Sequence, residues 1–405
     1  MRYPRIATSL LLSCAGVFLA GCHNNEDSEP IAPQTILTLQ VDKDYGQPGD
    51  RWIFASDENG EILDTQPYAD GQTVTLKSEK HPDKINVTLF SYFEYEGENK
   101  QTSFTTWGNV ASGTTLHLKT VTVDHPVTPE KGEATIRVSN YTGTAIVGIS
   151  NGYGYSYGGS ISEGNLEVDL SFYGVPSDIL LYGWRSDVPV YYMATGVKSD
   201  DVIERDYLTD FMPYPHQVQL NFPGKNSAII RGYDAKKSLD FTLMDTGWLN
   251  LSDHPVIGYL DGFDTYDMTV INVHANGSTT YHQKGAIDLS FDMPTFTASL
   301  SNTDIQNFSF EFSRDYTYRT ALWTNVVGKE YTWWTVNAPP GYAVKGLSIP
   351  SELVAKYPKL DMSKLVYGSL NFTDVIKGRS YEEFAQGVFD INSDDTSEEY
   401  VYRVK

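Results

Sequence analysis

The chain has 405 residues, of which 40% are hydrophobic, and its formal net charge at pH 7 is −22. A body this acidic repels nucleic acid and anionic lipid headgroups, so we exclude nucleic-acid binding. A chain of this length can bury enough apolar surface to be held together by its core alone.

The first 21 residues have the three parts of a secretory signal peptide. Arg2 and Arg5 form a basic start, an apolar stretch runs from about residue 6 to residue 19, and small residues follow. The apolar stretch is too short to span a bilayer as a helix, which needs about 20 apolar residues. We therefore expect residues 1–21 to be removed on export. The loss of Arg2 and Arg5 takes the net charge from −22 to −24.

The end of this segment carries a second, more specific signal. Leu19-Ala20-Gly21, followed directly by Cys22, resembles the lipobox of bacterial lipoproteins. The resemblance implies cleavage before Cys22 and diacylation of its thiol, which attaches the protein to a membrane; the alternative is an ordinary signal peptide with a chance cysteine. Because Cys14 lies in the removed segment, residues 22–405 then hold no disulfide, no cysteine nucleophile and no thiolate metal site.

Residues 22–33 are polar and acidic and show no apolar periodicity, so we expect a flexible tether. An acidic stretch directly after the lipidated cysteine also resembles the export tag of surface lipoproteins in Bacteroidetes-type bacteria. That resemblance implies display on the outer face of the outer membrane. An anchor that faces the periplasm is the alternative.

The rest of the chain alternates apolar and polar residues with a period of two, which is the pattern of a half-buried strand. The clearest runs are residues 37–41, 166–172, 218–222 and 308–312. Turn signals separate the strands at Asn59-Gly60, Asp70-Gly71 and Asn276-Gly277, and the last of these predicts a two-residue hairpin. Many short strands with such turns predict an all-β fold of antiparallel sheets.

Helical patterns are scarce and occur late in the chain. One predicted helix covers Ser351–Tyr357 and is stopped by Pro358. A second covers Ser380–Phe389, where Ser380 and Glu383 form a capping box. We therefore predict two or three tandem antiparallel β-sandwich domains with a few short helices near the C-terminus.

Composition also suggests where these domains begin and end. We expect an N-terminal β-sandwich over 34–123, a Pro-rich linker over 124–132, a second sandwich region over 133–222, and a β-rich region with short helices over 223–405. Residues 52–63, a strand, an acidic turn and a returning strand, resemble the carboxypeptidase-regulatory-like, immunoglobulin-like domains at the start of many Bacteroidetes lipoproteins. The resemblance implies a non-catalytic spacer.

The Gly/Tyr run of residues 152–159 has the most unusual local composition. If the segment is extended, Tyr153, Tyr155 and Tyr157 present three rings on one side, which suits stacking on sugar faces or on an apolar ligand. We take these tyrosines as candidate ligand-binding residues; the alternative is a loop or edge strand whose rings pack on the body. Other aromatic residues join such a surface or pack in the core: Trp184, Tyr191, Tyr192, Trp323, Trp333 and Trp334.

Residues 148–152 match the G-x-S-x-G pattern of a serine nucleophile at Ser150. That motif requires a strand before the serine and a helix after it, and the glycine-rich run that follows does not predict a helix. We therefore expect a chance match and assign no catalytic residue.

Acidic clusters were considered as metal ligands. Residues 42–46 and 57–60 resemble only pieces of calcium loops, because neither has the full ligand spacing. Asp261, Asp264 and Asp267 lie three residues apart and can approach a cation only if their segment folds back. We expect no metal site, and calcium is the one cofactor left open.

Two histidines flank the Asn276-Gly277 turn. Pairing around a two-residue turn places His274 opposite Thr279 and His282 opposite Ile271. The two imidazoles then do not face each other, so we do not expect a zinc pair.

These expectations describe a lipid-anchored envelope protein on the outer membrane that binds a glycan or another nutrient without catalysis. A structural or adhesive surface protein, with an envelope protein as its partner, is one alternative. A glycoside-active hydrolase is the other, because the spacing of its paired carboxylates is spatial and not visible in a sequence.

Overall fold

The computed structural model describes residues 32–46, 49–95, 99–120, 129–142, 148–157, 160–237, 239–247, 254–387 and 396–405. Within these ranges the protein is almost wholly β-structure with two short α-helices near the C-terminus, so the predicted all-β fold is confirmed. None of the described helices is long and apolar enough to cross a membrane. Cys22, the expected signal peptide and most of the tether lie outside the described residues.

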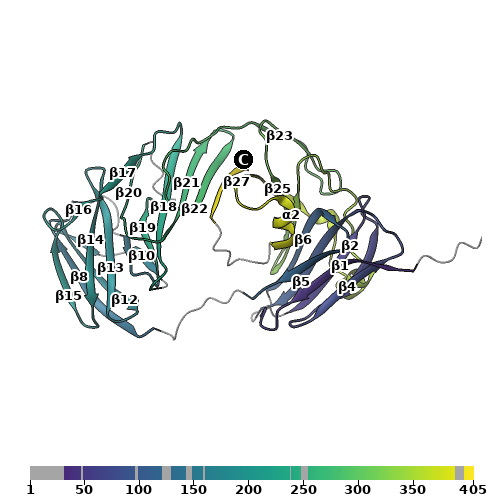
Figure 1. Cartoon of the computed structure of the whole chain (residues 1–405), viewed down its shortest axis with the longest axis horizontal. Helices are drawn as coiled ribbons and strands as arrows, with labels where there is room; N and C mark the ends of the chain where they lie inside the picture. Colours follow the sequence, from purple (N-terminus) through teal and green to yellow (C-terminus); the bar gives the residue numbers. More distant parts are fainter. Residues whose placement is uncertain are drawn as a thin grey trace, which may run out of the picture.

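A twelve-stranded sheet runs through the arch-shaped molecule (Figure 1). Its strands, in spatial order, are β19 (Leu239–Asp245), β18 (Lys225–Asp234), β21 (Thr265–His274), β22 (Gly277–Gly285), β28 (Ser397–Val404), β27 (Val366–Lys377), β25 (Tyr318–Val327), β26 (Glu330–Ala338), β6 (Lys100–Ala111), β5 (Lys84–Glu94), β2 (Asp50–Ser56) and β3 (Ile62–Pro67). Neighbouring strands are antiparallel except β26 and β6, which are parallel. Through this pair, strands of residues 50–111 and 225–404 share one sheet.

A small sheet covers the N-terminal end of the long sheet (Figure 1). Its strands are β4 (Thr73–Ser78), β1 (Gln34–Val41) and β7 (Thr114–Leu118). The apolar residues of the predicted run 37–41, Leu37, Leu39 and Val41, are all buried. They pack against Ile53 and Trp107 of the long sheet, so this end is a two-layer sandwich.

A second sandwich forms the other end of the arch (Figure 1). One of its sheets holds β11 (Ser160–Ser162), β12 (Asn165–Tyr173), β8 (Lys131–Ser139) and β15 (Val202–Asp206). The other holds β10 (Tyr155–Tyr157), β9 (Gly148–Ser150), β13 (Ser177–Arg185), β14 (Val188–Val197) and β16 (Met212–Pro213). The apolar side chains of the predicted run 166–172 face the core between these sheets.

The remaining elements lie between and over these sheets. They are β17 (His216–Gln219), paired with β20 (Val256–Tyr259); β23 (Ala298–Asn302), paired with β24 (Ser309–Phe312); α1 (Ser351–Lys356); the 3₁₀ turn η2 (Met362–Lys364); and α2 (Tyr381–Gly387).

α1 ends where its sequence predicts and α2 begins where its sequence predicts, whereas the predicted end of the second helix at Phe389 lies outside the described residues. α1 ends at Lys356, directly before Tyr357 and Pro358. At the start of α2 the Ser380 amide donates to Glu383 Oε2 (2.8 Å) and the Glu383 amide donates to Ser380 Oγ (3.3 Å). This is the reciprocal geometry of a capping box.

The β21–β22 hairpin is real, but its predicted register is wrong. His274 pairs with Gly277 and His282 pairs with Thr269, so the turn residues are Ala275 and Asn276. Gly277 belongs to β22 because β28 passes close to it: a Cβ atom there would lie 2.0 Å from the carbonyl oxygen of Arg403. The two histidines still do not face each other.

The Asn59-Gly60 turn touches the C-terminal part of the chain. Asp57 Oδ1 accepts hydrogen bonds from the amides of Asn59 and Glu61, both at 2.9 Å. Gly60 has a φ of +84°, and a Cβ atom there would lie 1.7 Å from the carbonyl oxygen of Gly346. Only glycine fits both the backbone conformation and the contact.

We therefore expect Gly60→Ala to lower the thermal unfolding midpoint more than Gly113→Ala. Gly113 has a φ of +82° and open space around its Cβ position. Its substitution therefore measures only the free-energy cost of a left-handed backbone conformation at alanine, about 1 kcal/mol. Gly60→Ala adds the steric clash, and we expect at least twice the drop of the control. Equal midpoints for the two variants would show that this contact does not constrain the fold.

Candidate ligand-binding groove

The Gly/Tyr run lies where the 131–213 sandwich meets the long sheet. The Asp240 amide of β19 donates to the Gly152 carbonyl at 3.1 Å. Tyr155 and Tyr157 share one face of edge strand β10, whereas Tyr153 lies in the preceding turn, which the Asn151 amide closes onto Gly154 O (3.1 Å). The side chains of Tyr155 and Tyr157 lie outside the described part, so the three-ring platform stays a prediction.

Tyr153 is 42% exposed and lies against the protein surface. Its ring covers Gly174, where a Cβ atom would lie 2.1 Å from Tyr153 Cε2. With Leu170 and Tyr173 it borders a depression of about 170 Å³. Pockets for drug-sized ligands occupy about 300–1,000 Å³, so this depression is small for an oligosaccharide.

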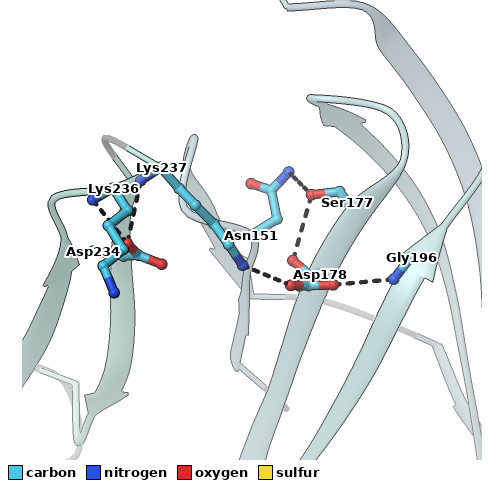
Figure 2. Close-up of polar contacts among 7 residues, drawn as sticks. All are labelled: Asn151, Ser177, Asp178, Gly196, Asp234, Lys236 and Lys237. Carbon is cyan, nitrogen blue, oxygen red and sulfur yellow. Dashed lines mark hydrogen bonds and ion pairs between the residues drawn. The ribbon is translucent and has the colours of Figure 1, made fainter. Parts of the chain in front are cut away.

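Asn151, Asp178 and Lys237 make polar contacts at this junction (Figure 2). Asn151 Nδ2 donates to the Tyr173 carbonyl (2.8 Å). Asp178 Oδ1 accepts from the Gly196 amide (3.0 Å), and Asp178 Oδ2 accepts from Lys237 Nζ of the β18–β19 turn (3.3 Å). The network joins both sheet systems, and its polar atoms are engaged in structural bonds.

Ser150 is not an exposed nucleophile. Its side chain is 1% exposed, and its hydroxyl accepts a hydrogen bond from the Thr242 amide at 2.9 Å. β9 is followed by a turn and β10, so the helix that a nucleophile elbow requires does not follow. The burial of Ser150 and the strand that follows its turn do not fit a nucleophile elbow.

The three aspartates considered as calcium ligands each interact with a different residue of the protein. Asp261 Oδ2 lies 2.7 Å from His216 Nε2, Asp264 Oδ2 accepts from the Ala235 amide (2.9 Å), and Asp267 Oδ1 lies 3.2 Å from His282 Nε2. The acidic residues of the other candidate loops also have internal partners: the Asp57 carboxylate closes its own turn, and Asp42 Oδ1 lies 2.7 Å from His117 Nε2. Across the described ranges, no group of three or more His, Cys, Asp or Glu residues is placed to hold a metal ion.

A more suitable site lies at the end of the long sheet, where the segment after α1 crosses β5, β6 and β26. There a groove of about 560 Å³ is lined by two tyrosines, four lysines, two carboxylates, three uncharged polar residues and three apolar residues. In that order they are Tyr92, Tyr357, Lys100, Lys356, Lys359, Lys364, Glu330, Asp361, Thr102, Asn325, Thr332, Val327, Pro358 and Leu360. We call it the Tyr357 groove.

The aromatic wall of the Tyr357 groove is built by the end of α1. Pro358 follows Tyr357, so the helix stops and Tyr357 packs against β5. The ring centroids of Tyr357 and Tyr92 are 4.6 Å apart, and Phe90 lies behind them, 5.4 Å from Tyr357. Both tyrosines are partly exposed, so ring surface remains open to a ligand.

Each lysine of the groove pairs with a carboxylate. The nitrogen–oxygen distances are 3.1 Å for Lys100–Glu94, 2.5 Å for Lys356–Asp50, 2.6 Å for Lys359–Glu330 and 3.3 Å for Lys364–Asp361. Positive and negative charges therefore balance locally, within a chain whose net charge is −22.

Three of these carboxylates are held in the ionised form. A hydrogen bond from Tyr92, with a second from the paired lysine, lowers the pKa of Glu94. Hydrogen bonds from a neighbouring serine lower the pKa of Asp361. At Asp50 partial burial pushes the pKa up, but hydrogen bonds from the lysine and tyrosine at the end of α1 outweigh it, and the pKa is lowered.

Sequence reasoning missed the Tyr357 groove because its residues are scattered. Tyr357 and its hydrogen-bond partner Asp50 are 307 positions apart. A local pattern indicates that Tyr357 ends a helix, but it does not indicate which strand the ring meets.

A second polar group stands on the open face of β21, β22 and β28. His282 Nε2 lies 3.2 Å from Asp267 Oδ1, and its Nδ1 lies 4.0 Å from Glu399 Oε1. The hydrogen bond to Asp267 raises the pKa of His282, and burial raises the pKa of Glu399. None of the three lines the Tyr357 groove, and we interpret them as an ion cluster that bridges three strands.

His282 makes this cluster sensitive to pH. Because its folded pKa is raised, its contribution to stability is fully present below the unfolded value of about 6.5 and is lost as pH rises through the folded value. We expect His282→Gln to lower the unfolding midpoint by about 2 °C at pH 5.5 and by much less at pH 8.5. The exposed His81→Gln serves as control, and a deficit independent of pH would contradict the assignment.

Comparisons with known proteins do not assign the chain to a family. No protein-family model matches the chain, and no curated protein matches it in sequence. One solved structure that aligns is a Ca²⁺-stabilised adhesin that helps an Antarctic bacterium reach out and bind ice. It is 7% identical, the alignment covers 92% of this chain and 98% of that chain, and the TM-score is 0.12. A TM-score of this size does not establish a shared fold.

Proposed function

We propose that the protein is a lipid-anchored binding protein of the outer cell surface that holds a neutral glycan in the Tyr357 groove without cleaving it. The observation that carries the proposal is the combination, in one groove, of open tyrosine rings with fixed hydrogen-bond donors and acceptors.

The chemistry of the groove suits a sugar. A pyranose has an apolar face that packs on an aromatic ring and hydroxyl groups that both donate and accept. Tyr92 and Tyr357 supply the rings. The lysine–carboxylate pairs around them supply ammonium donors and carboxylate acceptors, held in place by each other. Exposed pairs of this kind add little to stability, typically below about 1 kcal/mol, so their clustering favours a role in binding.

Charge favours a neutral ligand over an anionic one. The four lysines of the groove are matched by four carboxylates, so no net positive potential remains to attract an anion. The remaining surface is strongly acidic and repels anionic polymers.

The carboxylates of the groove also favour binding over hydrolysis. Glycoside cleavage needs one carboxyl group that stays protonated near neutral pH, through a raised pKa, opposite a second ionised one. The pKa values of Asp50, Glu94 and Asp361 are all lowered, so these groups are ionised and already paired. As ionised groups, these three carboxylates can accept hydrogen bonds from sugar hydroxyl groups.

The binding site is tested with the mature chain carrying Cys22→Ser on an array of neutral glycans. We expect Tyr357→Ala to weaken binding about tenfold or more, the effect of truncating a side chain worth at least about 1.4 kcal/mol. Tyr357→Phe keeps the ring and should retain most of the affinity. Unfolding midpoints establish that each variant is folded.

Tyr153→Ala is the matched control, since it removes the exposed ring of the Gly/Tyr run. Loss of binding with Tyr153→Ala but not with Tyr357→Ala would move the site to that run. Release of reducing sugar ends by the wild-type protein would contradict a purely binding role.

Lipid anchoring and surface display are proposed from the lipobox and the acidic tether. We expect radiolabelled palmitate to be incorporated into the wild-type protein and not into Cys22→Ser. Protease added to whole cells should then digest the protein. Protection in whole cells with digestion after lysis would show that it faces the periplasm.

A further inference from the structure

The strands that form the Tyr357 groove carry a second surface on their opposite side. Residues 330 and 332 of β26 and residue 325 of β25 face the groove. Since side chains alternate along a strand, residues 331 and 333 of β26 and residues 324 and 326 of β25 face the other way. The structure therefore presents two faces at one end of the sheet.

This opposite face is apolar and partly exposed. It carries Tyr331 and Trp333 of β26, Leu322 and Val326 of β25, and Val366 of β27, and we call it the Trp333 face. Val326 is 60% exposed, Val366 67% and Tyr331 40%. None of the five residues belongs to a hydrophobic core cluster of the described chain. Within the same ranges, neither aromatic ring has a hydrogen-bonded or stacked side-chain partner.

Uncharged polar residues alternate with these apolar ones. Ser103 of β6 and Thr324 of β25 flank Trp333 directly, and Gln101 of β6 flanks Tyr331. No residue that pairs with either ring in this register is charged. Rings framed by hydroxyl and amide groups suit the alternating apolar and polar surface of a sugar chain.

The Trp333 face continues into a second groove on β5 and β6. Ser103 and Thr105 line this groove of about 370 Å³ together with Tyr45 and Arg51. Arg51 is 7% exposed and pairs with Asp70 at 2.8 Å, and its guanidinium lies over the rings of Tyr45 and Tyr68, 5.8 and 5.3 Å from their centroids. These contacts hold the two tyrosine rings in place at the groove.

Two other occupants of the Trp333 face are disfavoured by charge. A second copy of the chain would bring together two bodies that each carry a net charge of −22 or more. An anionic membrane surface is repelled for the same reason. A neutral polymer meets no such barrier on a face without charged side chains.

We propose that the Trp333 face and the Arg51 groove form a second contact for an extended neutral polysaccharide. This inference rests on the proposed function and deepens it: the Tyr357 groove holds a short stretch of glycan, and the Trp333 face holds a further stretch of a long one. From β5 to β27 the surface spans four interstrand spacings, about 19 Å, so it takes several sugar units in a row. Two contacts to one polymer raise the apparent affinity by avidity.

The first measurement is affinity electrophoresis through gels that contain xylan, mannan, mixed-linkage β-glucan or soluble starch. The second is the affinity for a tetrasaccharide prepared from whichever polymer retards the protein. The variants are Tyr331→Ala and Trp333→Thr in the full mature chain with Cys22→Ser. Threonine preserves strand propensity on this face. The matched control is Tyr233→Ala, because Tyr233 lies on β18 of the same sheet and is also 40% exposed.

We expect Tyr331→Ala and Trp333→Thr to weaken polymer binding about tenfold and to leave tetrasaccharide binding unchanged. Tyr357→Ala should weaken both, and Tyr233→Ala neither. If Tyr357→Ala weakens both ligands while the two Trp333-face variants weaken neither, the second contact is wrong and the proposed function stands.

Two other outcomes are also decisive. A wild-type protein that no polymer retards overturns both proposals. A wild-type dimer in sedimentation that Tyr331→Ala dissociates assigns the face to a second copy of the chain and overturns the second contact.

Discussion

The parallel pairing of β6 with β26 is the interaction on which the rest of the architecture depends. Residues 100–107 pair with residues 330–337, and this ladder unites the strands of the N-terminal end with those of the C-terminal end. The indole of Trp334 is fully buried in the ladder, stacks on Phe104 at 4.4 Å and donates to Thr106 Oγ1 at 2.8 Å. Without the ladder, the N-terminal strands would not share a sheet with the rest of the chain.

Helix α2 fastens the far end of the same ladder. The Tyr381 hydroxyl lies 2.6 Å from the Gly108 carbonyl and 3.1 Å from the Asn337 carbonyl, so it bridges the two strands where their ladder ends. Phe384 stacks on Tyr318 at 4.2 Å. The helix thereby covers the sheet at one end of the ladder, and the Tyr357 groove and the Trp333 face lie at the other end.

Local features of this fold were predictable from sequence, and long-range ones were not. The strand alternation at 37–41, the stop at Pro358 and the capping box of Ser380 and Glu383 all depend on residues close in sequence, and all are confirmed. The turn at Asn276-Gly277 was misplaced because Gly277 is required by the approach of β28, more than 100 residues later.

At the candidate site, too, local sequence patterns do not reveal the long-range contacts. Neighbouring residues Trp333 and Trp334 have the same side chain, and the period of two places them on opposite faces. Which one is buried is decided by Phe104 across the ladder, a partner that no local pattern reveals. The sequence indicated that aromatic residues would form a binding surface, but β10, which holds two of the tyrosines it singled out, lies in the other half of the arch from β5 and β6 of the Tyr357 groove (Figure 1).

One end of one sheet thus carries two surfaces of different character. The Tyr357 groove carries paired charges and is bordered by tyrosine rings, whereas the five residues of the Trp333 face are uncharged. A crystal structure with a tetrasaccharide selected by gel retardation would show whether sugar rings stack on Tyr92 and Tyr357. We expect a sugar ring against Tyr357, with its hydroxyl groups bound by Lys356 or Lys359. A tetrasaccharide bound elsewhere, with the Tyr357 groove empty, would contradict this expectation.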